Sequence, residues 1–253
     1  MQQKAPSGSN QTGISTAPER SQAMLAGMEE FPPNSQGSAQ DIAQVRIAYA
    51  TTAEPIGSVP RPAGMKGKVQ TAIKTVLGEQ PTLFMDKLGE RLAFERTGTR
   101  LYEALIAKHE AFGSFAGGPS KADLEHILDE EYQHFLMLQT VIERLGGDPT
   151  AVTPSANLSA VASQGIPQVL VDPRTTLLQS LEAIMIAELA DHACWEALVE
   201  FAQQAGETDL AQQFEQALTT EQEHLIRVQT WLAAGQGRDN AGSQQSRQEV
   251  EES

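Results

Sequence analysis

The sequence predicts an all-α protein: an up-down four-helix bundle with a long crossover between helices two and three, plus an irregular N-terminal arm. Apolar residues recur at spacings of three and four over four long segments, as on the buried stripe of an amphipathic helix. Segments rich in glycine and proline separate the four stretches. No proline follows Pro173, so the last two helices can run without interruption.

The first two helices should form a hairpin. Helix one is expected to start near Pro81, because proline is favoured at the first position of a helix, and to end at Phe112 before the segment GSFAGGPS. Helix two should follow Ser120, a suitable N-cap, and should stop at Gly146 and Gly147. The two helices are therefore joined by a short glycine-rich turn.

The second hairpin follows a crossover of about 26 residues, 148–173, which contains four prolines and is not expected to form another core helix. Helix three should run over 174–204. Gly206 should end it, and helix four should occupy 209–234 before Gly235 stops it. A crossover of this length can run along the bundle and bring the second hairpin against the first.

Three regions are expected from these boundaries: an arm over residues 1–81, a bundle over 82–234 and a flexible tail over 235–253. The arm contains eight of the 13 prolines and few aromatic residues, which predicts a largely irregular segment. Weak helical periodicity over 39–50 and 66–77 indicates that short helices can form there. The tail has no periodic apolar positions and is expected to be solvated.

Composition excludes several classes of function. The chain has 18 basic and 33 acidic residues, a net charge of -15 that would repel nucleic acid and anionic lipid. It has no long uncharged stretch for a membrane span and no readable secretory signal. The single cysteine, Cys194, excludes an internal disulfide and a four-cysteine metal site within this chain. We expect a cytoplasmic protein.

Four glutamates lie inside the apolar stripes, where charged residues are not expected. They are Glu95, Glu131, Glu188 and Glu221, each with apolar residues three, four or seven positions away. A buried carboxylate is costly unless a positive charge compensates it, and no arginine or lysine is expected on these stripes. Metal ions would provide that compensation.

Two of these glutamates are followed three residues later by histidine. The pairs are Glu131 with His134 and Glu221 with His224. On a helix this spacing directs both side chains to one face, so each pair can bind one ion. Carboxylate oxygens with one imidazole per ion suit iron or manganese better than copper or zinc.

The positions of the glutamates along the helices indicate that they meet at one level. In an antiparallel hairpin, residues at the same height are equally far from the turn. The midpoint of Glu95 and Glu131 is Gly113, the first residue of the predicted turn, and the midpoint of Glu188 and Glu221 falls in the second turn. Four carboxylates and two imidazoles should therefore converge midway along the bundle.

This ligand set resembles that of the ferritin-like superfamily of di-iron carboxylate proteins, which includes bacterioferritins and rubrerythrin-like proteins. The resemblance covers residues 82–234. It implies one metal held by Glu95 with His134, a second held by Glu188 with His224, and bridging by Glu131 and Glu221. It also implies that Tyr102 lies beside the site, where a tyrosine can hydrogen-bond a ligand or donate an electron.

The resemblance implies a ferroxidase, or a di-iron oxidase or peroxidase, that uses two iron ions, with manganese possible, and acts with Fe(II) and dioxygen or peroxide. Two alternatives stay open: a di-iron or di-manganese enzyme that acts on an organic substrate or as a catalase, and a metal-free helical interaction module. The chain lacks a rubredoxin module, so the self-contained electron supply of rubrerythrins is not expected, and it lacks an evident fifth helix, so a 24-subunit cage is not expected. A smaller homo-oligomer such as a dimer is expected.

Neighbouring polar residues receive simpler interpretations. Glu130 and Glu223 adjoin the predicted ligands but should point away from them into solvent. His192 and Asp191 lie one turn after Glu188, where they either support a ligand or are ordinary interior residues. Cys194 is expected to be a small buried side chain.

Overall fold

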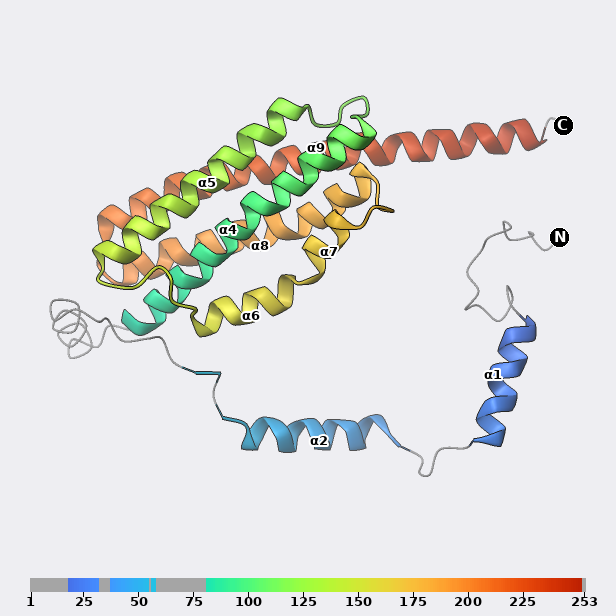
Figure 1. The fold of residues 1–253 in the computed structure, drawn as a ribbon, viewed down its shortest axis with the longest axis horizontal. Helices are drawn as coiled ribbons and strands as arrows, with labels where there is room; N and C mark the ends of the chain where they lie inside the picture. The colour runs from blue at the N-terminus through green and yellow to red at the C-terminus, as the bar shows by residue number, and fades with distance from the viewer. Residues whose placement is uncertain (1–17, 32–36, 55, 58–80, 252–253) are drawn as a thin grey trace. The chain divides into compact units, whose positions relative to one another are not determined.

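The computed structural model describes residues 18–31, 37–54, 56–57 and 81–251, and these residues form eight helices and no strand (Figure 1). The all-α prediction is therefore confirmed for the described part of the chain. The chain divides into two compact units, residues 1–55 and 56–253.

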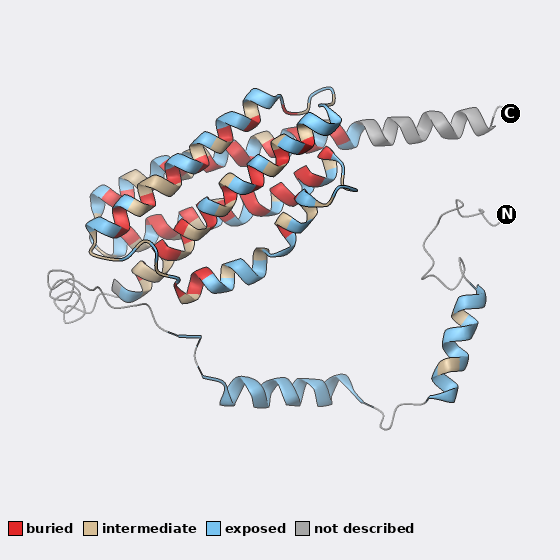
Figure 2. Cartoon of the chain, in the orientation of Figure 1, coloured by how far each residue is buried: buried red, intermediate tan, exposed pale blue. Residues whose placement is uncertain are grey.

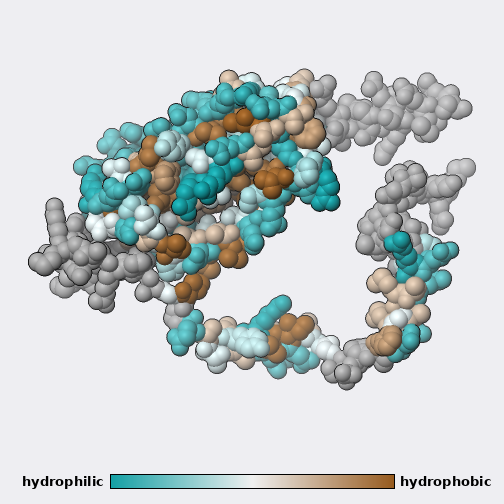
Figure 3. Space-filling model, in the orientation of Figure 1, coloured by the Kyte–Doolittle hydropathy of each residue, from teal (hydrophilic) through white to brown (hydrophobic). Residues whose placement is uncertain are grey.

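The first unit contains two helices, α1 (Pro18–Glu30) and α2 (Ala39–Thr52), and neither has a buried residue. Ser38 caps α2 by accepting a hydrogen bond from the backbone of Asp41, whose carboxylate in turn accepts one from the Ser38 backbone. The helix expected over 39–50 is confirmed, whereas α1 was not predicted. The other expected helix, 66–77, lies outside the described residues. Figure 3 shows hydrophobic side chains on the surfaces of both helices.

Four long helices form most of the second unit: α4 (Pro81–Phe112), α5 (Lys121–Arg144), α8 (Leu177–Gln204) and α9 (Thr208–Glu251). α4 packs along α5, α8 packs along α9, and the two hairpins meet mainly through α4 and α8 (Figure 1). The expected bounds of the first two helices and the start of α9 are confirmed to within a residue.

The helix ends follow the expected chemistry. Ser120 caps α5 together with Asp123, and Thr176 caps α8 together with Gln179, so α8 begins three residues after the predicted start. Gly146 and Gly206 end α5 and α8 with φ of 84° and 70°, a left-handed conformation that favours glycine. These two positions are where the sequence places the stops.

The end of α9 differs from the prediction. The helix was expected to end before Gly235, but it continues to Glu251 through the segment expected to be a non-helical tail. Gly235 keeps a negative φ and lies against the side chain of Leu178 on α8. Glycine at this position permits close packing of the two helices, so it does not act as a helix stop.

The crossover is also more ordered than predicted, because it contains two short helices, α6 (Pro154–Ser163) and α7 (Gly165–Val171). α6 packs on α4, and α7 packs on α8 and α4. Ile166 and Leu170 of α7 are buried, so the crossover contributes to the core. Pro154 and Pro167 lie in the first turns of their helices, where the missing N–H breaks no helical hydrogen bond.

Buried residues lie on the inner faces of the long helices (Figure 2). Two apolar clusters fill the interior of the second unit. The first lies toward the α4–α5 turn and includes Leu101, Leu105, Leu124, Ile127, Leu181, Ile184, Val228 and Trp231. The second lies toward the α8–α9 turn and includes Phe84, Leu88, Leu138, Ile142, Trp195, Leu198 and Phe214. On each long helix the stripe glutamate falls in sequence between residues of the two clusters, so a polar layer is enclosed at each end by apolar side chains.

Within the part of the chain that is described, none of the helices combines the length and the apolar character needed to cross a membrane.

Candidate metal centre

The six residues predicted to bind metal meet in one buried polar layer, each long helix contributing at least one. Their exposed fractions range from 0 to 8%, and they are Glu95, Glu131, His134, Glu188, Glu221 and His224. Among them lie two groups whose ligand atoms are all within 4.8 Å of one another. The structure thus brings together every residue in the predicted set.

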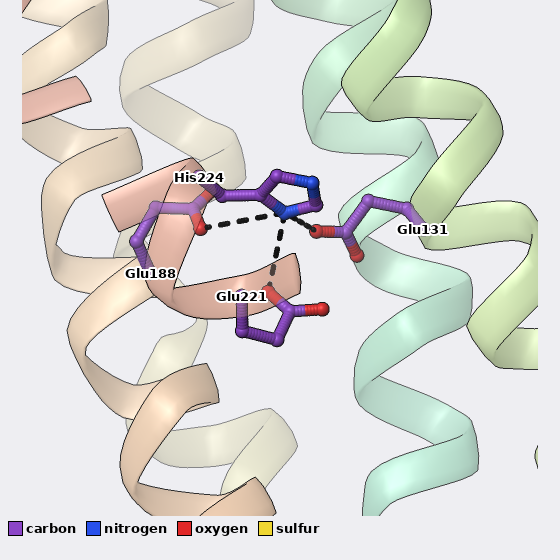
Figure 4. Close-up of side chains that lie close together, drawn as sticks. All are labelled: Glu131, Glu188, Glu221 and His224. Carbon is purple, nitrogen blue, oxygen red and sulfur yellow. Dashed lines mark ion pairs between the residues drawn. The ribbon is translucent and has the colours of Figure 1, made fainter. Parts of the chain in front are cut away.

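The first group consists of Glu131, Glu188, Glu221 and His224, shown in Figure 4. The Nδ1 atom of His224 lies 3.2 Å from Glu221 Oε2, 3.6 Å from Glu131 Oε1 and 4.0 Å from Glu188 Oε2. The three carboxylates come from α5, α8 and α9, and all point toward the same ring nitrogen (Figure 4). This group offers one nitrogen and three carboxylates to a cation.

The second group consists of Glu95, His134 and Glu221. The Nδ1 atom of His134 lies 2.6 Å from Glu221 Oε1 and 3.8 Å from Glu95 Oε2. The two histidine rings have centroids 6.5 Å apart. Because Glu221 directs one oxygen to each histidine, it lies between the two groups.

Two donors orient the outer carboxylates. The Tyr102 hydroxyl donates to Glu188 Oε1, and the Trp195 indole Nε1 donates to Glu95 Oε1 at 3.0 Å. Burial and the adjacent Glu188 raise the pKa of Tyr102, so its hydroxyl keeps the proton it donates. In both glutamates Oε1 is engaged and Oε2 is left for another partner. Tyr102 therefore lies beside the cluster, as the family resemblance implied.

Glu130 takes a different position from the one expected. It was predicted to be solvated, but its Oε2 lies 3.0 Å from His224 Nε2, the ring nitrogen opposite the one that faces the carboxylates. A carboxylate on the outer nitrogen fixes the orientation of a histidine ring and raises its basicity. The ring of His224 is therefore held at both nitrogens.

Arg91 and Asp191 extend the polar layer, and Arg91 corrects the expectation that no basic residue lies on the stripes. Arg91 is 1% exposed and lies one turn before Glu95, with Nε 2.9 Å from Glu95 Oε1. Its Nη1 lies 2.7 Å from Asp191 Oδ1. The layer thus holds five buried carboxylates and one guanidinium, which leaves four negative charges when every carboxylate is ionised and both histidines are neutral.

Gly98 is a second residue that the sequence reasoning missed. It lies in α4 directly beside Glu131, where a Cβ would approach the carboxylate carbon to 2.8 Å and the Oε2 oxygen more closely still. Any side chain at this position would displace the Glu131 carboxylate. The absence of a side chain therefore creates the space that this carboxylate occupies.

The electrostatics of the cluster favour a compensating cation. Burial and neighbouring carboxylates raise the pKa of Glu188 to about 8 and also raise the pKa values of Glu95 and Glu131. Burial opposes the ionisation of Glu221 as well, but the adjacent imidazoles hold its pKa at about 2. The cluster thus combines carboxylates that resist ionisation with one that ionises readily.

Unpartnered atoms mark the same centre. Seven buried atoms of the predicted ligands have no hydrogen bond within the described structure: Oε2 of Glu95, Glu131 and Glu188, both carboxylate oxygens of Glu221, and Nδ1 of His134 and His224. Six of them, all but Glu131 Oε2, lie at ion-pair distances from one another without hydrogen-bond geometry. Buried polar atoms are rarely left in this state, so the residues present fit a bound metal pair.

Other candidate residues lie outside this centre. His192 places its Nδ1 3.9 Å from Glu196 Oε2 and belongs to neither ligand group. Cys194 is partly exposed and not fully buried as expected.

No protein-family model, no curated protein and no solved structure matches this chain.

Proposed function

We propose that the second unit is a ferritin-like dinuclear metal protein that acts as a ferroxidase or as a di-iron oxidase or peroxidase. The observation that carries this proposal is the convergence of six buried ligands, seven of whose oxygen and nitrogen atoms have no hydrogen-bond partner in the described structure. Oxygen-rich sites with one imidazole per ion suit iron or manganese. The arrangement of ligands on four antiparallel helices supports the ferritin-like assignment.

Two divalent ions would satisfy the ligands and the charge together. Glu95 and His134 would hold one ion, Glu188 and His224 would hold the other, and Glu131 and Glu221 would bridge them. The buried charge supports this number of ions, because Asp191 and Arg91 neutralise each other as an ion pair. The four remaining glutamate charges equal the charge of two divalent cations.

A pair of Fe(II) ions supplies two electrons together to one dioxygen or peroxide molecule. The chain's own contribution is orientation and enclosure. Tyr102 and Trp195 each hold one oxygen of an outer glutamate, and Glu130 holds the ring of His224. The apolar clusters on both sides limit the access of water, which strengthens electrostatic interactions inside the layer.

The test is aerobic addition of Fe(II) to purified full-length protein. Formation of Fe(III), followed by absorbance, is expected to exceed that of a Glu131→Ala/His134→Ala variant, which removes one predicted bridging carboxylate and the histidine of one metal position. Anaerobic Mn(II) titration with electron paramagnetic resonance should give two ions per chain for the native protein. Equal oxidation rates in the native protein and the variant would reject the proposal.

A metal-free helical interaction module is the second candidate, and Arg91 favours it, because a buried guanidinium already compensates part of the charge. Elemental analysis separates the two candidates. Well under one metal per chain after expression in iron-rich and in manganese-rich medium would support the metal-free module. An organic substrate, catalase activity, a homo-oligomeric state and a cytoplasmic location stay predictions.

A further inference from the structure

The two proposed metal positions differ in their ligands. The group around His224 contains three carboxylates whose ligand atoms lie within 4.8 Å of one another and of the ring nitrogen, from Glu131, Glu188 and Glu221. The group around His134 contains two, from Glu95 and Glu221. Because each ionised carboxylate adds a negative charge, the Glu188–His224 position should attract a divalent cation more strongly than the Glu95–His134 position.

A buried positive charge lies beside only one of the two outer glutamates. Arg91 Nε is 2.9 Å from Glu95 Oε1, whereas Oε1 of Glu188 accepts a hydrogen bond from the neutral hydroxyl of Tyr102. An arginine side chain does not lose its proton in a protein. Glu95 therefore shares its negative charge with a guanidinium, which leaves less of that charge for a metal ion.

Asp191 limits this effect of Arg91. Its Oδ1 lies 2.7 Å from Arg91 Nη1, and one of its oxygens lies within 4.8 Å of oxygens from Glu95, Glu131 and Glu221. Removal of the Asp191 charge would leave the guanidinium free to act on Glu95, and removal of the guanidinium would leave the Asp191 charge unopposed. The two members of this ion pair should therefore affect a nearby cation with opposite sign.

The two histidines differ in the same direction. His224 has Glu130 Oε2 3.0 Å from its outer ring nitrogen, Nε2, and such a carboxylate makes a histidine a stronger metal ligand. For His134, both ion pairs within the described residues involve Nδ1, the nitrogen that faces the cluster. Ligand number, neighbouring charge and histidine basicity thus all favour the position at His224.

We infer that the Glu188–His224 position binds its ion first, and that Arg91 acts through Glu95 to keep the Glu95–His134 position weaker. The ion at the weaker position is the one that exchanges first. This inference rests on the proposed function, and it adds to that function an order of loading and a positioning residue that sets it.

The order of loading is measured by anaerobic Mn(II) titration of the full-length protein with electron paramagnetic resonance. At one Mn(II) per chain we expect the spectrum of isolated ions, and at two per chain the spectrum of an exchange-coupled pair. His134→Ala should remove the weaker binding step and keep the tighter one. His224→Ala should remove the tighter step.

The role of Arg91 is measured by calorimetric Mn(II) titration of charge variants. Arg91→Gln should tighten the weaker step by about tenfold, and Asp191→Asn should weaken it by about tenfold. Arg91→Lys keeps the positive charge and should keep the weaker step weak. The matched control is Arg96→Gln, which removes the same charge from an exposed position of α4 and should leave both steps unchanged.

Opposite effects of the two charge variants separate this role from a structural one. If the ion pair only held the helices together, Arg91→Gln and Asp191→Asn would both weaken metal binding, and that result would overturn the inference. If Arg91→Gln does not fold, Asp191→Asn, which keeps the shape of the side chain, decides alone, because an unchanged or tighter weak step would overturn the inference.

Failure of this inference can be distinguished from failure of the proposed function. Two Mn(II) ions bound with equal affinity, or a coupled pair already dominant at one Mn(II) per chain, would overturn the order of loading and leave the dinuclear centre intact. A native protein that binds no Mn(II) and oxidises no Fe(II) would reject the proposed function, and this inference with it.

Discussion

Gly98→Ala provides the sharpest test of the site geometry. The added methyl group would lie 2.8 Å from the carboxylate carbon of Glu131, whereas ordinary van der Waals contact begins at 3.4 Å. The carboxylate must therefore move by at least 0.6 Å, the difference between these two distances. Metal–ligand distances vary by only about 0.2 Å, so this displacement removes Glu131 from its bridging position.

The expected consequence is selective loss of metal binding. We expect the affinity for Mn(II) to fall by about 10- to 100-fold, which reduces the free energy that saturating metal adds to folding by about 1.4 to 2.7 kcal/mol. Without metal, the free energy of unfolding of Gly98→Ala should lie within about 1 kcal/mol of that of the native sequence, because alanine is the better helix former. Calorimetric Mn(II) titration and urea unfolding, with and without metal, measure both quantities.

Gly235→Ala is the matched control for this experiment. It also adds a methyl group to a tightly packed helical glycine, but the group it meets is the flexible end of the Leu178 side chain, which is not a predicted ligand. This variant should bind Mn(II) with native affinity. Native affinity in Gly98→Ala as well would refute the bridging role of Glu131.

Three further predictions follow from the surroundings of the cluster. Glu130→Gln removes the carboxylate from His224 Nε2 and should weaken Mn(II) binding by about tenfold. Glu125→Gln, on the exposed surface of the same helix, should leave Mn(II) binding unchanged. Equal effects of the two substitutions would show that Glu130 does not support His224 as a ligand. Tyr102→Phe leaves Glu188 Oε1 without its donor and should lower the free energy of unfolding, measured by urea titration, by about 1 to 3 kcal/mol. An unchanged free energy of unfolding would show that this hydrogen bond does not stabilise the fold. In the metal-free protein the pKa of Glu188 is raised to about 8, so the folded state favours the protonated carboxyl. The contribution of this group to the free energy of unfolding is therefore fully present below about pH 4.5 and is lost as the pH rises through 8. Urea unfolding of chelator-treated protein should therefore show lower stability at pH 8 than at pH 5.5, and a flat or rising profile would refute the assignment.

The sequence predicted the long helices because the local signals agreed with the tertiary packing. Ser120 and Gly146 terminate α5 by local chemistry that needs no partner segment. The predicted helix stop at Gly235 was wrong, because the sequence does not distinguish a glycine that ends a helix from one that permits close packing. The neighbouring Leu178 side chain shows that Gly235 is of the second kind. The prolines of the crossover were interpreted as breaks, although Pro154 and Pro167 lie in permitted first-turn positions.

For the candidate site, helical periodicity was sufficient to predict which side chains share a helical face and at which height they lie. The spacing of Glu131 and His134 and the distance of each stripe glutamate from its turn were enough to predict the convergence. The atoms from different helices that meet could be identified from the packed helices alone. Arg91 reaches Asp191, 100 residues away, and Glu130 of α5 reaches His224 of α9, because long side chains can bend toward a partner that helical periodicity does not reveal. The role of Gly98 could not be predicted either, because it depends on the Glu131 carboxylate of another helix, which occupies the space that a side chain at this position would fill.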